Sequence, residues 1–379
     1  MKSILFLRPD LNSTFAQTKS LKKYGVKTRI FLGLNYPEKL IFKKDEVIGK
    51  EFFKVKHLVF KILNSIINFF QLLYYSIKSE YIIYYGNPPL NPMFDRLHPF
   101  NKFSLELYLL KIILKKKLIY QPSGCMQEYL KKEFEKFDEG NICGNCGHFN
   151  KCDDTENQKN FDLVNKYFDL KIGSGFSSSN QYPQDQFKFK SIDLDLFSPE
   201  ISVPKNFLLK NFDGITIYHS NFLRESGRVE EGKNIKGTGF IIDAIRKLKK
   251  EGYKLRELIL DDIPNRHLRY YQVQADIIVD QLIYGQFGHT AVECMALGKP
   301  VICYLRPQWK EFYLKTYPEH RELPIIEANT DNIYLVIKNL LDNQNLIKKF
   351  GVKSRDFVKR QYNPDINSRI LLKKLNCLK

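Results

Sequence analysis

Residues 275–304 read ADIIVDQLIYGQFGHTAVECMALGKPVICY, and this stretch indicates the fold of the second half of the chain. We expect a buried strand that ends at Asp280, followed by a loop that contains two glycines. A short helix is predicted from about residue 289 to residue 297, with Gly298 as its C-terminal cap. A second apolar run begins at Val301. Strand, loop, helix and strand in this order are typical of a parallel sheet with helices on its faces.

The same alternation continues along the whole chain. Helical patterns separate the apolar runs, for example in residues 103–115. A clear helical stripe is formed by Phe240, Ile241, Ala244, Ile245 and Leu248. The predicted strands are residues 4–7, 28–32, 81–85, 117–120, 170–172, 215–219, 257–260, 277–280, 301–304 and 325–327. Because the rhythm occurs twice, we expect an α/β chain of two doubly wound, Rossmann-like domains.

The composition fits a two-domain globular protein. The 379 residues exceed the usual length of one domain, and 43% of them are hydrophobic, which is enough for two cores. Lysine and arginine outnumber the acids by 60 to 42, and the formal charge of +18 favours anionic partners such as nucleotide phosphates or anionic lipids. Lysines spread over solvated faces would give the same charge. The basic residues do not cluster with aromatic ones, so we expect no nucleic-acid partner.

The N-terminal residues give no sign of export. Arg8-Pro9-Asp10 ends the first apolar run before it reaches the length of a signal-peptide core, and a first buried strand explains the run better. The seven cysteines are too few for a disulfide scaffold. We therefore expect a cytoplasmic protein.

Residues 58–75 form a mostly apolar segment of about the length of a membrane span. Lys61, Asn64, Asn68 and Gln71 recur in it at spacings of three and four, which places a narrow polar stripe on one side of a helix. We favour a helix that packs within its domain. One alternative is a helix that rests on the inner membrane surface as part of a peripheral membrane protein, helped by the basic charge. The other is a true span, which the charge of Lys61 disfavours.

The loop after Asp280 has properties that suit phosphate binding. Gly285 and Gly288 let a ligand approach the backbone, and the N–H groups of a helix start attract phosphate. Glu293 lies one turn into the helix, on the same side as His289, where its carboxylate can accept two hydrogen bonds from a ribose diol. The carboxyl end of a parallel strand is also where open α/β sheets bind ligands. A plain strand–loop–helix with a solvent-facing Glu293 is the alternative.

The segment ECMALGKPV, residues 293–301, resembles the nucleotide-sugar-binding segment of the large retaining GT-B glycosyltransferase family. That family has a glutamate that opens a helix of small residues, which Gly-x-Pro-Val closes. Residues 215–248 resemble the family's first C-domain strand and helix, with Lys236-Gly237 as the pair that opens the helix. DLDLFSP, residues 193–199, and the tail from Phe357 are similar to the family's linker and closing helix. The resemblance covers about residues 190–375, and the first half is similar only in its strand–helix rhythm.

The resemblance implies a GT-B architecture, with two Rossmann-like domains that face each other across a cleft, and a hexosyltransferase of the bacterial surface-glycan branch. It implies that Lys236 grips the donor diphosphate together with Arg224 or Arg228, between which the sequence does not decide. A cation at a helix start also requires an anion nearby, which agrees with this role. The residues expected at the catalytic centre are Lys236, Arg228 and Glu293. The other residues expected to bind the donor are His219, Asn221, Arg224, Gly237, Asp280, Gln281, Gly285, Gln286, Gly288, His289, Thr290 and Ala291.

This chain departs from the family at three places. Many relatives carry another glutamate eight positions before the one that Glu293 matches. That glutamate lies near the sugar ring, and its position here is Gly285. Gln286 and His289 are the candidates to replace it. Residues 9–13, PDLNS, stand where relatives often have a glycine-rich loop. Residues 85–89, YGNPP, stand where they often have a histidine near the acceptor.

We expect the domains to join near residues 190–206, an extended stretch that contains Pro199 and Pro204. The acceptor-side domain would comprise residues 1–200, with a cysteine cluster at 125–152, and the nucleotide-sugar-binding domain residues 201–355. Residues 356–379 would form a C-terminal helix that returns to the first domain. Residues 346–375 as a whole predict two helices, broken around Tyr362-Asn363-Pro364.

The resemblance implies transfer of a sugar from a nucleotide-diphosphate donor to a glycan or lipid-linked acceptor, with retention at the anomeric carbon. Lys236, an arginine and the helix start near Gly288 would stabilise the charge on the leaving phosphate. Asp193 and Asp195 have the spacing of an Asp-x-Asp metal motif but lie in the expected linker, so we expect no metal in catalysis. Two alternatives stay open: an inactive GT-B-like binding or scaffold protein, and a sugar-nucleotide epimerase, which would need acid and base groups in the cleft.

Cys143, Cys146 and Cys152 form a C-x2-C-x5-C pattern with His148 between them. Two thiolates at the closer spacing can share one tetrahedral zinc ion, and His148 or Cys125 would supply the fourth ligand. We expect a structural zinc here. Cysteines that simply lie in a loop, and an oxidisable pair, are the alternatives.

Overall fold

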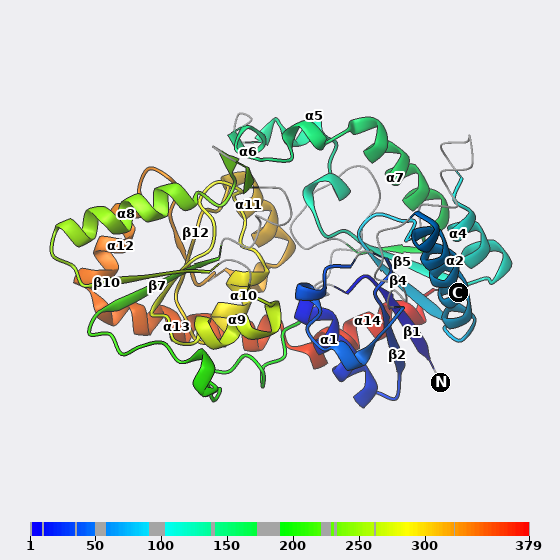
Figure 1. Cartoon of the computed structure of the whole chain (residues 1–379), viewed down its shortest axis with the longest axis horizontal. Helices are drawn as coiled ribbons and strands as arrows, with labels where there is room; N and C mark the ends of the chain where they lie inside the picture. The colour runs from blue at the N-terminus through cyan, green and yellow to red at the C-terminus, as the bar shows by residue number, and fades with distance from the viewer. Residues whose placement is uncertain are drawn as a thin grey trace. The chain divides into compact units, whose positions relative to one another are not determined.

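The computed structural model describes residues 2–9, 11–34, 36–49, 58–90, 103–137, 141–172, 190–220, 229–230, 233–260, 263–321 and 323–378. The chain divides into two compact units. Unit 1 comprises Met1–Lys131, Asp153–Ser191 and Pro364–Lys379, and unit 2 comprises Lys132–Cys152 and Ile192–Asn363. Each unit is built around its own parallel sheet (Figure 1).

The elements of unit 1 alternate as the sequence predicts. Its strands are β1 (Ser3–Leu7), β2 (Lys27–Phe31), β3 (Val47–Ile48), β4 (Tyr81–Tyr85), β5 (Lys117–Gln121) and β6 (Leu170–Lys171). Its α-helices are α1 (Leu11–Lys23), α2 (Leu58–Ile77), α4 (Leu105–Tyr108), α7 (Asp154–Tyr167) and α14 (Pro364–Asn376). A π-helical turn, η3 (Leu109–Ile113), continues α4, and short 3-10 turns are η1 (Glu38–Leu40), η2 (Lys44–Glu46) and η4 (Cys125–Gln127).

The sheet of unit 1 has the strand order β3-β2-β1-β4-β5-β6, and neighbouring strands are parallel. The helices α2, α4 and α7 contribute Leu72, Leu107 and Val164 to one hydrophobic core with the strands. Right-handed crossovers place α1 on the opposite face. There α14 packs against it, and the Gln17 amide donates to the Ser368 hydroxyl at 3.1 Å. The last helix of the chain therefore completes the first unit.

Unit 2 contains the second series of strands and helices. Its strands are β7 (Ile215–Ser220), β8 (Val229–Glu230), β9 (Lys233–Asn234), β10 (Leu255–Leu260), β11 (Ile277–Val279), β12 (Val301–Cys303) and β13 (Ile325–Glu327). Its longer helices are α8 (Thr238–Lys250), α9 (Asn265–Gln272), α10 (His289–Ala296), α11 (Pro307–Thr316), α12 (Ile333–Asp342) and α13 (Gln344–Gln361). Shorter elements are α5 (Lys131–Phe134), which begins at the unit boundary, α6 (Asn141–Gly144), η6 (Phe149–Lys151), η7 (Lys205–Phe207) and η9 (Pro318–His320).

The main sheet of unit 2 has the strand order β10-β7-β11-β12-β13, and neighbouring strands are again parallel. The chain passes from β7 to β10 on one side and then crosses to β11 on the other side. The strand order therefore reverses between β7 and β11, which is the point where doubly wound sheets bind ligands. Apolar side chains such as Ile217, Ile245 and Ile337 form the core beneath this point.

The strands expected from the sequence are present, and their ends differ from the expected ones by no more than two residues. The predicted break of the C-terminal segment is also found, since α13 ends at Gln361 and α14 begins at Pro364. Residues 103–115 are shorter as an α-helix than expected, because η3 takes over at Leu109. Phe240 does not join the buried stripe of α8 and is half exposed.

The compact units differ from the expected domains in two respects. Residues 192–200 and the cysteine-containing segment Lys132–Cys152 belong to unit 2, not to the first domain. The segment that returns to unit 1 begins at Pro364, whereas α13 stays with unit 2 through its packing on α10. The boundary lies there because Arg355 of α13 donates to the carbonyl oxygens of Leu194, Phe197 and Ala296, which ties the linker to unit 2.

Helix α2 packs within unit 1, and it does so with part of its polar stripe turned inward. Asn64 and Asn68 are buried, and the Asn68 amide donates to the Gly49 carbonyl oxygen at 3.3 Å. Lys61 remains exposed. The helix is long and apolar enough to qualify as a candidate membrane span. Only 28% of its apolar 18-residue stretch is buried in the protein. Its outward side is therefore apolar.

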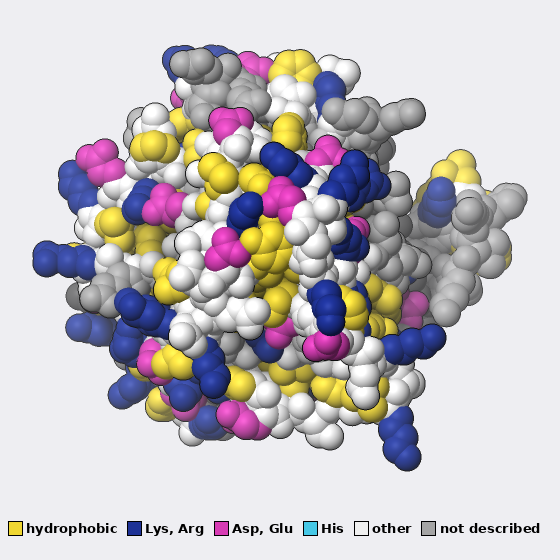
Figure 2. Space-filling view, turned by 90° about the vertical axis from the view of Figure 1, so that its left-hand side faces the viewer, with side chains coloured by type: hydrophobic (Ala, Val, Ile, Leu, Met, Phe, Trp, Pro, Cys, Tyr) yellow, Lys and Arg dark blue, Asp and Glu magenta, His cyan; other side chains and the backbone are white. Residues whose placement is uncertain are grey.

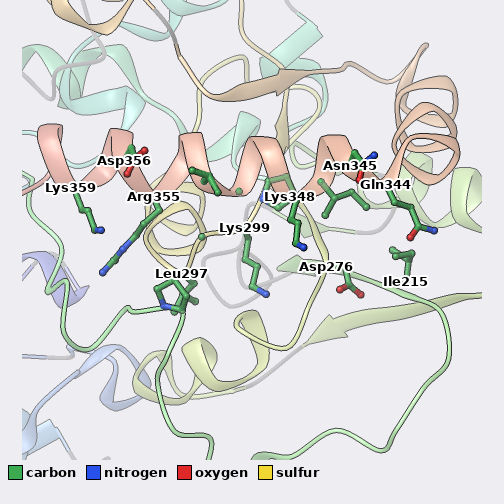
Figure 3. A pocket seen from close by; sticks show the side chains of 16 residues that line it. Ile215, Asp276, Leu297, Lys299, Gln344, Asn345, Lys348, Arg355, Asp356 and Lys359 are labelled. Atoms are coloured by element: carbon green, nitrogen blue, oxygen red, sulfur yellow. The ribbon is translucent and has the colours of Figure 1, made fainter.

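Helix α13 packs closely on the turn before β12. Figure 3 shows side chains of the helix next to side chains of that turn. A Cβ atom at Gly351 would lie 2.3 Å from the backbone carbonyl oxygen of Gly298. Only glycine permits this approach, although glycine is a poor helix former.

We predict that Gly351→Ala destabilises the protein by about 1 to 3 kcal/mol, because the new methyl group must push two backbones apart. Gly239→Ala in α8 is the matched control, since a Cβ atom there meets nothing within 4 Å. It should stabilise the protein by about 0.5 to 1 kcal/mol through helix propensity. Chemical unfolding measures both changes, and equal effects of the two variants would contradict the packing argument.

Candidate functional site

The candidate site lies in unit 2, at the carboxyl ends of β7 and β11. Three segments meet there: the turn that opens α8 with Lys236, the end of β11 with Asp280, and the start of α10 at Gly288. The backbone N–H of Leu282 donates to the Lys236 carbonyl oxygen at 3.0 Å, which joins the first two segments. The sequence prediction that these residues come together is consistent with this geometry.

Asp280 connects all three segments through its carboxylate. Its Oδ2 atom accepts the backbone N–H of Gly288 at 2.8 Å, and its Oδ1 atom lies 3.7 Å from the Lys236 ammonium. Both charged side chains are buried. A buried charge is tolerated only when it is paired, and breaking such a pair is costly. The ion pair therefore fixes a cation beside the N-terminus of α10, where an anion would be attracted.

A chain of hydrogen bonds behind Lys236 holds its turn in place. The Asn234 side chain accepts the Lys236 N–H at 2.9 Å and donates to the Thr238 hydroxyl at 2.7 Å. The Thr238 hydroxyl donates to Nε2 of His219, and Nδ1 of His219 donates to the Val279 carbonyl oxygen, each at 2.8 Å. Burial, and next the charge of Lys236, lower the pKa of His219 to about 3. His219 is therefore neutral, and both of its ring nitrogens are occupied.

His219, expected at the donor, is fully buried, and both of its ring nitrogens bond within the protein. Ala291 is also fully buried. Asn221, Arg224 and Arg228 lie outside the described residues, so the partner of Lys236 among the arginines stays undecided. Tyr284, Gln286, Gly288, His289 and Thr290 are partly exposed along the loop, so a ligand can reach them.

Glu293 is buried in α10 and does not face solvent, unlike in the alternative of a plain strand–loop–helix with a solvent-facing Glu293. Its Oε2 atom accepts the amide of Gln272 in α9 at 3.4 Å, and its Oε1 atom lies 3.8 Å from Nε2 of His289. Gln272 is fully buried as well. The carboxylate is thus held in a fixed orientation one turn below the helix start, a position that suits a hydrogen-bond acceptor for a ligand.

The structure gives a reason for Gly285 at the position where the family that the sequence resembles often has a glutamate. Its φ angle is 82°, a region that only glycine enters freely. A Cβ atom there would lie 2.1 Å from Cγ of Arg306. The backbone N–H of Arg306 also donates to the Gly285 carbonyl oxygen at 2.9 Å. Arg306 thus occupies the place that a side chain at residue 285 would need.

The sequence did not predict that the segment Lys132–Cys152 packs beside the loop that contains Tyr284 and Gly285. The guanidinium of Arg306 lies 5.5 Å from the Phe134 ring centroid and 4.7 Å from that of Phe137, and the Tyr284 ring contacts Phe134 at 5.9 Å. Lys233, beside the Lys236 turn, lies over the Phe149 ring at 5.4 Å. Nothing local in the sequence pairs these residues, since more than eighty positions separate them. The segment Lys132–Cys152 forms part of the surroundings of the candidate site.

The structural zinc expected at the cysteines of that segment stays a prediction. Among the residues that the structure describes, no three His, Cys, Asp or Glu side chains gather closely enough to hold a metal ion. Cys125 belongs to unit 1, whereas Cys143, Cys146 and Cys152 belong to unit 2.

The corresponding point of unit 1, between β1 and β4, is filled by the protein's own side chains. Arg8 donates to the carbonyl oxygens of Asn87 and Leu90, each at 3.2 Å, and burial lowers its pKa. The buried carboxylate of Glu106 accepts the Tyr84 hydroxyl and the Leu90 N–H, each at 2.8 Å. Arg8 thereby ties the chain after β1 to the chain after β4.

A hollow of about 710 Å³ also exists in unit 2, but at the opposite end of the strands. Figure 3 shows α13 with Lys348 and Arg355 on one side of it and Lys299 with Asp276 on the other. Asp276 and Pro300 precede β11 and β12, so this hollow lies at the amino ends. It is separate from the candidate site.

We predict that His219 makes stability depend on pH. Its folded pKa of about 3 lies below the ordinary value of 6.5, so its contribution is complete above pH 6.5 and is lost as the pH falls towards 3. Wild type should lose up to about 1.4 kcal/mol per pH unit in this window relative to His219→Gln. Unfolding curves across the window measure the difference, and parallel pH profiles would contradict the neutral, buried assignment.

We predict that Gly285→Glu, which would create the glutamate pair of the family that the sequence resembles, destabilises the protein by more than about 2 kcal/mol. The strain comes from the positive φ angle and from the clash with Arg306. Gly25→Ala is the control for the angle alone, because Gly25 has φ 75° and an open surrounding. If Gly285→Glu costs no more than Gly25→Ala, the clash with Arg306 is not real.

No protein-family model matches the chain, and no curated protein matches it. The fold is nevertheless similar to solved structures over nearly all of their length. Sucrose-phosphate synthase from Thermosynechococcus elongatus has a TM-score of 0.60 and 12% identity, and 99% of this chain and 98% of that chain are covered. HepE of Anabaena, solved in complex with UDP-glucose, has a TM-score of 0.54 and 12% identity, with both chains fully covered.

A structure described as a putative UDP-N-acetylglucosamine 2-epimerase from Listeria monocytogenes is also similar, with a TM-score of 0.51 and 12% identity over 99% of this chain and 96% of that chain. At such identities the likeness speaks for the fold alone. Two parallel-sheet α/β units of this topology, together with these likenesses, show that the chain has the glycosyltransferase-like GT-B fold.

Proposed function

We propose that this protein is a glycosyltransferase that binds a nucleotide-diphosphate sugar in unit 2. The observation that carries the proposal is the meeting of Lys236, Asp280 and the start of α10 at the reversal point of the sheet. A cation and a helix N-terminus at that point form a site for a diphosphate. HepE, which shares the fold, was solved with UDP-glucose.

In this proposal the diphosphate lies against the N–H groups of His289 and Thr290, next to the Gly288 N–H that Asp280 holds. The ammonium of Lys236 balances its charge from below, while Asp280 keeps that ammonium and the helix start in register. Glu293 would accept hydrogen bonds from the ribose hydroxyls, since Gln272 and His289 already fix its carboxylate. Gln286 and His289, which are partly exposed, are our candidates for contact with the sugar.

The chemical step that we propose is electrostatically assisted. As the bond between the anomeric carbon and the diphosphate breaks, negative charge grows on the leaving phosphate, and fixed positive groups stabilise it most when they need not reorganise. Lys236 and the start of α10 are such groups because both are held by Asp280. Arg224 or Arg228 would add a second cation. We propose that this charge is sufficient without a catalytic metal.

The finer parts of the proposal rest on the sequence resemblance. They are a hexose as the transferred sugar, retention at the anomeric carbon, a glycan or lipid-linked acceptor, and a role in polysaccharide biosynthesis. The similarity to the 2-epimerase fold supports a second candidate, a sugar-nucleotide epimerase. An epimerase would change the donor sugar without any acceptor, whereas a transferase requires one.

We predict that one nucleoside diphosphate or its sugar derivative raises the unfolding temperature of the wild type and that Glu293→Gln reduces this effect. A ligand at 100 times its dissociation constant stabilises a protein by about 2.7 kcal/mol, which a thermal shift assay detects. The panel should contain uridine, guanosine, adenosine and cytidine diphosphates and their sugar derivatives. Lys236→Met should weaken binding more strongly, because it removes a charge.

Asp276→Asn is the matched control, because Asp276 precedes the same strand β11 at its other end and accepts the Thr216 N–H at 2.8 Å. It should leave the nucleotide effect unchanged. A thermal shift that survives in both Glu293→Gln and Lys236→Met would move the donor away from α10. Absence of any shift across the panel would favour the scaffold alternative. Product analysis with and without acceptors then separates transferase from epimerase.

A further inference from the structure

Helix α2 in unit 1 buries several polar side chains and exposes apolar ones, the reverse of an ordinary surface helix. Asn64, Ser65, Asn68 and Ser76 are buried, although Phe69 and Leu72 share that side and are buried with them. The opposite side carries large apolar side chains. They are Leu58, Val59, Ile62, Leu63, Phe70, Tyr74 and Ile77, and each exposes between 39% and 69% of its surface.

These exposed side chains form one continuous stripe, because most of them follow each other at spacings of three or four along the helix. The neighbouring segment adds Tyr108, Ile112 and Ile113 of α4 and η3, which are also exposed. Both segments cover the same face of the sheet (Figure 1). A soluble surface rarely shows a contiguous apolar area of this kind unless something covers it.

The charges around this stripe are positive. Helix α2 contains Lys61 and no acidic residue. Lys78 follows Ile77 directly, and its ammonium lies 3.9 Å from the Tyr74 ring centroid. Lys116 donates to the Ile77 carbonyl oxygen at 3.1 Å, and the exposed Lys115 precedes it. The apolar stripe is thus flanked by lysines, with an aromatic residue between. This arrangement matches the boundary layer of a lipid bilayer.

We propose that the stripe on α2, together with Ile112 and Ile113, binds a membrane surface that contains anionic lipids. The apolar side chains enter the boundary between headgroups and acyl chains, and Lys78 and Lys115 lie at the headgroups. This inference does not depend on the donor site, because all of its residues belong to unit 1.

The helix lies on the membrane and does not cross it. Phe69 and Leu72 are anchored in the interior of unit 1, and Asn68 holds the Gly49 carbonyl oxygen at the end of β3. A crossing helix would have to leave these partners and expose its polar side to lipid, which is costly. Only one side of α2 is therefore available to the bilayer.

Charge also separates this proposal from pairing with a second copy of the chain. Two copies that met through this stripe would bring their lysines together at a contact that buries them, and like charges repel there. Anionic headgroups instead neutralise Lys78 and Lys115. The whole chain carries +18, so its long-range attraction favours an anionic surface over another copy.

The test is co-sedimentation of the full chain with vesicles of phosphatidylcholine alone or mixed with phosphatidylglycerol. Wild type should partition onto the anionic vesicles, and more weakly as salt is raised. Phe70→Ser combined with Ile77→Ser should lower the partition coefficient about tenfold or more, because both side chains lose their insertion into lipid. Phe240→Ser with Leu335→Ser is the matched control, since these residues are similarly exposed in unit 2.

A second pair of variants tests the charge. Lys78→Gln and Lys115→Gln should each lower binding to anionic vesicles about fivefold and leave binding to phosphatidylcholine unchanged. Lys250, exposed at the end of α8 in unit 2, offers the matched control, and Lys250→Gln should bind as wild type does. Unfolding temperature and far-UV circular dichroism must match wild type, so that a loss of binding is not a loss of fold.

Three outcomes would overturn the proposal. Wild type that stays in the supernatant with anionic vesicles has no such surface. Binding that survives Phe70→Ser with Ile77→Ser places the membrane contact elsewhere. Sedimentation equilibrium that shows a dimer, abolished by the same two substitutions and unaffected by vesicles, assigns the stripe to a second copy. Nucleotide-induced stabilisation of unit 2 should persist in all of these variants, which keeps the two proposals separately testable.

Discussion

The carboxylate of Asp280 holds together the part of unit 2 on which the candidate site depends. One oxygen fixes the start of α10 through the Gly288 N–H, and the other faces the ammonium of Lys236 at the opening of α8. In a buried place such a pair has one arrangement, because losing either partner would leave an uncompensated charge. The helix start and the cation are therefore preorganised side by side, which is the condition for stabilising a phosphate without reorganisation.

The surroundings of this pair give a structural reason for Gly285 at a position where the family that the sequence resembles often has a glutamate. Gly285 adopts a positive φ angle, and Arg306 occupies the space that a side chain there would need. Arg306 is in turn covered by Phe134 and Phe137, from a segment that precedes the rest of unit 2 in the chain. The partly exposed Gln286 and His289 are therefore the residues that we propose for contact with the sugar. A substitution at residue 285 alone cannot restore the family's pattern.

The two units differ in where their buried polar side chains lie. Unit 2 gathers charged and amide side chains at the reversal point of its sheet, whereas unit 1 fills the same point with Arg8 and Glu106 and turns the polar side of α2 inward. Figure 2 shows basic side chains spread among acidic, polar and apolar ones on one face of the molecule. The excess of lysine on that face thus forms no single patch, in contrast to the lysines beside α2, which accompany an apolar stripe.

The sequence by itself determined the strands, the reversal of strand order that follows from their alternation with helices, and the two helices at the tail. These features are local, since apolar runs, glycines and prolines act over a few residues. Periodicity defined the two faces of α2 but could not say which one is buried, because that depends on Gly49 and the core residues that the helix meets. The tertiary structure alone decided that His219 is enclosed by Thr238 and Val279 and that Lys132–Cys152 joins unit 2. Such contacts join distant positions, and no local propensity encodes them.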